Sequence, residues 1–148
     1  MRRALTLTVF GLCILITGCG DGRLRTKGQL LKGGQPFIPP EGEYIEITFV
    51  PILPDGKPAP DYYYAEVDQT TGTFRPAGKD LKGMPPGKYR VAVELMKKKK
   101  DQFGGKFDTM RSPFVFDVDS QTKEIVIDLD TPPLAPAETQ RRENRRRS

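Results

Sequence analysis

Residues 65–96 constrain the fold of this chain more than any other stretch. They contain two turns, and each turn is followed by residues typical of a β-strand. The first turn, residues 68–72, is rich in Asp, Thr and Gly and leads into residues 73–75. The second, residues 83–87, leads into residues 89–95, where apolar and polar side chains alternate. A period of two indicates a strand with one buried face, so the stretch predicts two turn-then-strand units in tandem.

The residues of these two units have physical roles in turns and in a core. Gly72 is expected to take a positive φ, which a β-carbon would penalise. Asp68 is expected to accept backbone hydrogen bonds within its turn. The side chains expected to face inward are Phe74, Tyr89, Val91 and Val93.

Seven segments in all have the composition of short strands, and none shows convincing helical periodicity. The segments are residues 24–31, 44–50, 62–67, 73–76, 88–96, 112–118 and 124–129. Short strands separated by turn signals predict an all-β protein, a single seven-stranded antiparallel β-sandwich. About 110 residues suffice for one such core and not for two.

Two connections between these strands carry specific expectations. Residues 97–111 are charged and rich in glycine, so we expect a long exposed loop there. Residues 119–123 form a turn, so the strands before and after it are expected to pair as a hairpin.

The N-terminus has the pattern of an export signal. A short basic region, residues 1–3, precedes an apolar run over residues 4–16 that is too short for a confident membrane span. Small residues then precede Cys19, and this arrangement resembles the lipobox of bacterial lipoproteins, whose cysteine carries the lipid. The alternative is a plain signal peptide, or a membrane anchor, that happens to contain Cys19.

The whole chain therefore divides into four expected parts. These are a lipoprotein signal peptide (1–18), a lipidated tether (19–23), the β-sandwich domain (24–130) and a disordered tail rich in proline and arginine (131–148). The net charge of +5 reflects the two ends, because residues 20–137 contain seventeen basic and seventeen acidic residues. No basic face of the domain, and no nucleic-acid partner, follows from the charge.

Several classes of chemistry are excluded by residue types that the chain lacks. It has no histidine, and its only cysteines are Cys13, inside the signal, and Cys19. A Ser–His–Asp triad, a histidine-ligated zinc and a cysteine nucleophile in the mature domain are therefore ruled out. We expect no catalytic residue, no metal site and no cofactor.

Three motifs, in order, resemble those of transthyretin-like domains, also called carboxypeptidase regulatory-like domains. Residues 27–36 are similar to the opening "G-x-V, x-G-x-P" pattern, and Asp68, Gly72 and Phe74 to the "D-x-x-G-x-F" turn. Residues 86–91 are similar to the "P-G-x-Y-x-V" strand entry. The resemblance implies a prealbumin-like sandwich, and small lipoproteins of planctomycete-like bacteria pair this domain with a lipobox. Transthyretin-like hydrolases depend on histidines, so their mechanism is not expected here.

Two exposed groups of side chains are candidates for binding. One is the run Tyr62, Tyr63 and Tyr64, of which at least one ring must point outward from a strand. The other is Lys97, Lys98, Lys99 and Lys100, which could touch an anionic surface. The alternatives are the edge of an amphipathic strand for the tyrosines and a solvated hairpin tip for the lysines.

Two further sites are possible, and the alternative for both is ordinary surface charge. An acidic cluster for calcium would use Asp117, Asp119, Asp128 and Asp130, although regular ligand spacing is lacking. An internal isopeptide bond, as in related adhesin domains, would join Lys27 to Asp128 with Glu46 or Glu94 as the acid.

These observations favour a lipid-anchored, non-enzymatic module of the cell envelope that faces the periplasm or the exterior. Its partners would be the membrane, through the anchor, and an envelope protein or polysaccharide. The alternative is an accessory domain of an envelope enzyme or transport complex that binds carbohydrate or peptide.

Overall fold

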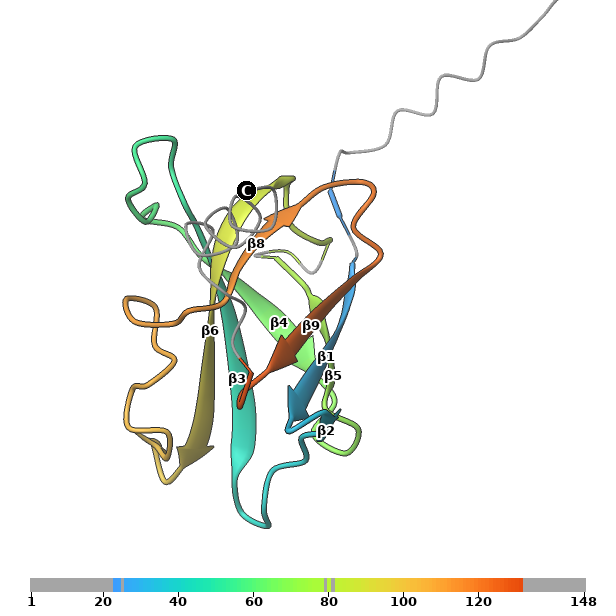
Figure 1. The fold of residues 1–148 in the computed structure, drawn as a ribbon, viewed down its shortest axis with the longest axis vertical. Coiled ribbons are helices and arrows are strands. Elements are labelled where there is room, and N and C mark those ends of the chain that lie inside the picture. The colour runs from blue at the N-terminus through green and yellow to red at the C-terminus, as the bar shows by residue number, and fades with distance from the viewer. Residues whose placement is uncertain (1–22, 25, 79, 81, 132–148) are drawn as a thin grey trace, which may run out of the picture.

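The computed structural model describes residues 23–24, 26–78, 80 and 82–131, and Figure 1 shows their arrangement. The described residues form strands and turns without a helix, which confirms the all-β prediction. The strands are β1 (Lys27–Lys32), β2 (Gln35–Pro36), β3 (Tyr44–Pro51), β4 (Tyr63–Val67), β5 (Thr73–Pro76), β6 (Gly87–Lys97), β7 (Lys100–Asp101), β8 (Val115–Val118) and β9 (Glu124–Asp128).

The strands belong to one open sheet. Its order is β2-β1-β5-β4-β3-β6-β7, and in addition β8 pairs with β6 and β9 pairs with β1. Every pair is antiparallel except β1 with β9, which is parallel. In Figure 1, β1, β5 and β9 lie on one side of the molecule and β3 and β6 on the other.

One hydrophobic core joins the two sides of the sheet. Side chains from β1, β3, β5, β6 and β9 belong to a single buried cluster. Phe49 of β3 lies at its centre, with its ring 6.2 Å from that of Phe74 and 6.1 Å from that of Tyr89. The inward orientation predicted for Phe74, Tyr89, Val91 and Val93 is confirmed, since all four are buried.

The predicted strands are close to the observed ones, with differences at the first. β1 begins at Lys27, and Leu24 instead forms an isolated bridge with Met84. Leu30 is fully buried and Leu31 half-buried, so only the first of these adjacent leucines faces the core. The described residues form nine strands where seven were expected, because the two-residue strands β2 and β7 carry no periodic signal.

The expected hairpin between the last two strands is wrong. β8 pairs with β6 from Gly87 to Arg90, whereas β9 runs parallel to β1. The intervening turn does form, since the backbone N–H of Thr122 donates to the Asp119 carbonyl at 3.1 Å. The turn leads the chain across to the opposite end of the sheet, where Ile125 and Ile127 are buried in the common core.

The expected long exposed loop over residues 97–111 is wrong in two respects. Its first part is the short strand β7, which folds back onto β6 with Met96 opposite Asp101. Its second part is held against the core by Phe107, which is only 3% exposed and packs 5.3 Å from Phe114. Asp101 fixes the turn by accepting backbone N–H groups of Leu95, Phe103 and Gly105.

The first turn within residues 65–96, at residues 68–72, forms as predicted. Asp68 Oδ1 accepts the backbone N–H of Thr70 at 2.8 Å, and its carbonyl accepts that of Gly72 at 2.9 Å. Gly72 has φ +67°, and a β-carbon there would lie 2.6 Å from the Phe37 carbonyl oxygen. Glycine is therefore required at this position both by its backbone conformation and by the approach of another segment.

Candidate functional site

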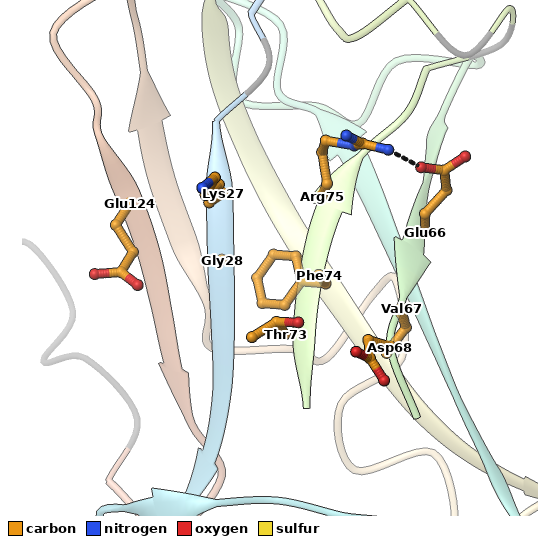
Figure 2. Close-up of a pocket in the computed structure, with 9 residues that line it drawn as sticks. All are labelled: Lys27, Gly28, Glu66, Val67, Asp68, Thr73, Phe74, Arg75 and Glu124. Atoms are coloured by element: carbon orange, nitrogen blue, oxygen red, sulfur yellow. Dashed lines mark hydrogen bonds and ion pairs between the residues drawn. The ribbon is translucent and has the colours of Figure 1, made fainter. Parts of the chain in front are cut away.

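A hollow in the described surface lies over β9, β1, β5 and β4 (Figure 2). We call it the charged hollow; its volume is about 530 Å³, and the lining residues used below are Lys27, Gly28, Glu66, Phe74, Arg75 and Glu124. Phe74 and Gly28 supply apolar surface at its floor, while the other four carry charge. A floor of this kind with ionic groups around it suits an amphiphilic ligand.

The charged hollow lies where the ladder between β1 and β5 stops. Their register is only two residues long, Gly28 opposite Phe74 and Gln29 opposite Thr73. Extending that register would place Thr26 opposite Pro76, and proline has no N–H to donate. The strands are therefore not held together beyond Phe74, and the surface is open there.

A glycine is also required at the floor. An added β-carbon on Gly28 would lie 2.1 Å from the Phe74 ring, well inside van der Waals contact. Figure 2 shows this ring between β1 and β5, next to Gly28. Gly28 therefore lets the aromatic side chain of one strand lie against the backbone of the next.

Both signs of charge surround the charged hollow. Arg75 and Glu66, opposite each other on β5 and β4, form an ion pair at 2.6 Å. Lys27 and Glu124 lie opposite each other on β1 and β9, yet within the described part of the chain neither makes an ion pair. On one wall of the hollow, Arg75 and Glu66 neutralise each other. On the other wall, the charges of Lys27 and Glu124 are available to a ligand.

The tyrosine run divides between the two faces of the sheet. Tyr62 and Tyr64 point outward, 46% and 56% exposed, and their rings are 5.4 Å apart at 88°. Tyr63 points inward, 6.1 Å from the Tyr89 ring. The outward pair lines a second hollow of about 370 Å³ together with Pro60, Asp61 and Gly78; we call this site the tyrosine corner.

The lysine run forms the tip of a hairpin and is not brought to the tyrosines. Lys98 and Lys99 both have positive φ, 47° and 65°, as a two-residue turn between β6 and β7 requires. Lys97 pairs with Glu43 at 2.9 Å. The tip lies beyond the end of β3, whose first residue, Tyr44, is opposite Met96.

The four aspartates of the possible calcium site are Asp117, Asp119, Asp128 and Asp130, and two of them accept hydrogen bonds from nearby backbone N–H groups. Asp128 accepts the backbone N–H groups of Gly33, Gly34 and Asp130, and the Asp130 N–H heads the interactions that lower its pKa. The backbone N–H of Gln121 donates to Asp119, and this hydrogen bond is the main cause of the lowered pKa of Asp119. Because β8 and β9 lie at opposite ends of the sheet, the four do not converge, and no group of three or more possible ligands forms among the described residues.

The residues of the possible isopeptide bond, Lys27 and Asp128, are not brought together. Lys27 is opposite Glu124 on β9, whereas Asp128 is opposite Leu31 at the other end of the same ladder. Lys27 is also exposed, and the candidate acids Glu46 and Glu94 lie on β3 and β6. The parallel pairing of β1 with β9 separates the lysine from the aspartate by the length of the strand.

The predicted lipidation residue Cys19, the signal peptide and most of the C-terminal tail lie outside the described residues. Within the described part, no helix is long and apolar enough to span a membrane.

Sequence reasoning missed the charged hollow. Its charged residues alternate with buried or half-buried ones on four strands, and each strand alone has the pattern of an ordinary amphipathic surface. The one signal that could have indicated it is Pro76, a residue with no N–H to donate to a neighbouring strand such as the one that contains Gly28.

Comparisons of the chain with protein-family models, with curated proteins and with solved structures found no match. The two hollows are therefore interpreted from their own geometry and charge.

Proposed function

We propose that this chain is a lipid-anchored, non-enzymatic binding module of the bacterial envelope, with a transthyretin-like sandwich as its folded part. The lipobox-like sequence around Cys19 supports the anchor. The three sequence motifs and the core shared by both sides of the sheet support the sandwich. The charged hollow is the binding site of the proposed module.

The observation that carries the binding role is the unpaired wall of the charged hollow. Lys27 and Glu124 lie on adjacent strands of a sheet whose other residues fix their backbones, so a ligand would meet them in a prepared position. Preorganisation of this kind reduces the entropic cost of binding. A partner with an apolar group between a cation and an anion, such as a peptide segment of an envelope protein, would match the floor and both charges.

The anchor is tested by replacing one cysteine at a time. The Cys19→Ala chain is expected to move from the membrane fraction to the soluble fraction, because the site of lipid attachment is lost. Cys13→Ala, inside the signal, is the matched control and should leave the chain in the membrane fraction. The fractions are compared by immunoblotting. Continued membrane association of Cys19→Ala would refute the lipid anchor.

The binding role is tested by reversing one charge in the charged hollow. Proteins that co-purify with the full chain from detergent-solubilised membranes are quantified by mass spectrometry. Lys27→Glu is the variant, and Lys88→Glu, at an exposed position of β6, is the control. Recovery of a specific partner should fall about fivefold for Lys27→Glu, the equivalent of about 1 kcal/mol. Equal recovery with both variants would exclude this hollow as the binding site.

A further inference from the structure

The hairpin turn between β6 and β7 consists of lysines at positions where the backbone favours other residues. We call residues 97–100 the lysine tip. Lys97 and Lys100 are paired across the hairpin, and Lys98 and Lys99 form the turn with φ 47° and 65°. A two-residue turn with two positive φ angles favours Asn and Gly, because a longer side chain is penalised there. Strained backbone of this kind clusters at functional sites, so the charge of the two lysines is the property that calls for an explanation.

The charges of the lysine tip are open to a ligand. Lys98, Lys99 and Lys100 are exposed, and within the described part of the chain none of them makes an ion pair. Lys97 differs, because its Nζ lies 2.9 Å from a carboxylate oxygen of Glu43. Three consecutive ammonium groups are therefore available at the end of the hairpin.

The acidic residues near the lysine tip do not cancel this charge. Glu43 is paired with Lys97, and Asp101 is half-buried and accepts three backbone N–H groups. Two more carboxylates remain, Glu41 in the turn before β3 and the half-buried Glu94 on β6. Against them stand the exposed lysines of this end of the molecule, Lys98, Lys99, Lys100 and Lys106. The tip thus keeps an excess of positive charge.

Hydrogen bonds fix the backbone beneath these charges. The Gln102 N–H donates to the Leu95 carbonyl at 2.7 Å, and Gln102 Nε2 donates to the Lys100 carbonyl at 2.8 Å. Phe107, buried in the core, holds the segment that follows the hairpin. The turn is therefore ordered before a ligand arrives, which reduces the entropic cost of binding.

The lysine tip lies at the opposite end of the domain from the point where the chain enters it. Leu24 forms a bridge with Met84, just before β6 begins, and the tip follows the last residue of β6. Eleven residues of extended strand separate the two ends by about 35 Å, and Figure 1 shows the beginning of β1 and the end of β6 far apart. Attraction between exposed charges is largely screened beyond about 10 Å.

This separation decides between a lipid and a polymer as the partner, and this step rests on the anchor proposed above. With Cys19 held at the membrane, the end where the chain enters lies beside the lipids, and the lysine tip is directed away from them. An acidic protein is also a poor match, since the centres of protein interfaces are rich in aromatic residues and Arg and poor in Lys. A polymer with repeated anionic groups needs only exposed cations.

We propose that the lysine tip binds an anionic polysaccharide whose repeating units carry carboxylate groups. Consecutive ammonium groups on an ordered turn would contact successive carboxylates of the polymer. The site is separate from the charged hollow, so the inference goes beyond the binding role given to that hollow.

Polygalacturonate is the direct probe, and pullulan, a neutral polysaccharide, is the control. Binding to the full chain in a nonionic detergent is measured by biolayer interferometry at low and at high salt. Polygalacturonate should bind saturably at low salt and more weakly as salt screens the charges, whereas pullulan should not bind. Equal binding of the two polymers, or no saturable binding of polygalacturonate, would overturn the proposal.

A pair of double variants with equal loss of charge locates the site. Lys98→Asn with Lys99→Gly should weaken polygalacturonate binding about three- to tenfold, because two exposed ion pairs are lost. The same variant should raise the Tm by about 2–5 °C, because the turn receives the residues that its backbone favours. Lys82→Gln with Lys88→Gln removes two exposed lysines at the other end of the domain and should stay within about twofold. Equal weakening in the two double variants, or unchanged binding in the first, would overturn the assignment.

The other partner classes are tested with the same variants. Sedimentation with phosphatidylglycerol vesicles, or recovery of a protein, that depends on Lys98 and Lys99 in place of polygalacturonate binding would overturn the proposal. Loss of partners in Lys27→Glu without polygalacturonate binding at the lysine tip would refute this inference and leave the proposed function standing. Binding of polygalacturonate at the tip with equal partner recovery in Lys27→Glu and Lys88→Glu would support this inference and exclude the charged hollow.

Discussion

The pairings of β3 with β6 and of β1 with β5 show how ladder length determines where the surface of this sheet is open. β3 and β6 are paired over eight residues, from Tyr44 opposite Met96 to Pro51 opposite Tyr89. β1 and β5 are paired over two residues, and the charged hollow lies where that short ladder ends. Both pairs contribute to the same core, so the difference concerns only the outer surface.

The largest expected effect comes from the core that the two pairings share. Phe49→Ala in β3 and Phe74→Ala in β5 should each lower the free energy of unfolding by about 3–5 kcal/mol, because each removes a buried ring. Since the two rings contact one core, urea unfolding should remain a single transition in both variants. Coincident curves from far-UV circular dichroism and tyrosine fluorescence would show this. Two separate transitions would mean that the two sides of the sheet unfold independently.

A smaller effect is expected from glycine positions on the two sides. Gly28→Ala should lower the free energy of unfolding by about 1–3 kcal/mol, because its β-carbon would overlap the Phe74 ring. Gly87→Ala on β6 is the matched control: its β-carbon would meet Tyr89 at an ordinary 3.5 Å. In a double-mutant cycle, Phe74→Leu should reduce the cost of Gly28→Ala, since the ring is the obstacle. Additive losses, measured by urea denaturation, would show that the ring does not set the cost.

The smallest expected effect concerns the outer surface of the long ladder. Burial, then the charges of Asp101, Glu46 and Asp108, raise the pKa of Glu94. When the pKa of a carboxyl is higher in the folded than in the unfolded state, the protein loses stability as the pH rises through these two pKa values. Glu94→Gln should therefore raise the free energy of unfolding at pH 7 by a few tenths of a kcal/mol, the usual size of surface effects.

The pH dependence separates this charge effect from other causes. The gain from Glu94→Gln should disappear at pH values below the ordinary glutamate pKa, where Glu94 is protonated in both states. The same variant measured below and above that pKa is therefore its own control. A gain that is constant from pH 3 to pH 7 would contradict the explanation.

Much of the fold could be predicted from local chemistry. The Asp68 turn, the positive φ of Gly72 and the inward side of β6 depend on residues close together in the sequence, and all three are confirmed. The pairing of β9 could not be predicted in this way. Both β8 and β9 have strand composition, but which partner each takes depends on residues 87–90 and 27–31, far away along the chain.

The candidate sites show the same division. Alternation along β4 predicts that neighbouring tyrosines face opposite ways, and Tyr62 and Tyr64 do face outward together. Their right-angle arrangement, and the meeting of Lys27 with Glu124, depend on side-chain geometry and on sheet order. The prediction of an exposed loop at residues 97–111 was wrong for a related reason, since it also depended on a contact between distant residues. Phe107 lies among charged residues in the sequence, yet its side chain is buried in the core.

The pairing of β1 with β9 also has a consequence for how the protein is made. Synthesis proceeds from the N-terminus, so β1 emerges first among the strands and β9 last. Until residues 124–128 have left the ribosome, Gly28 and Leu30 lack the neighbours Ile125 and Ile127 that cover them in the finished core. Contacts between such distant residues also slow folding, because a long loop must close first. The complete domain therefore cannot form until β9 has emerged.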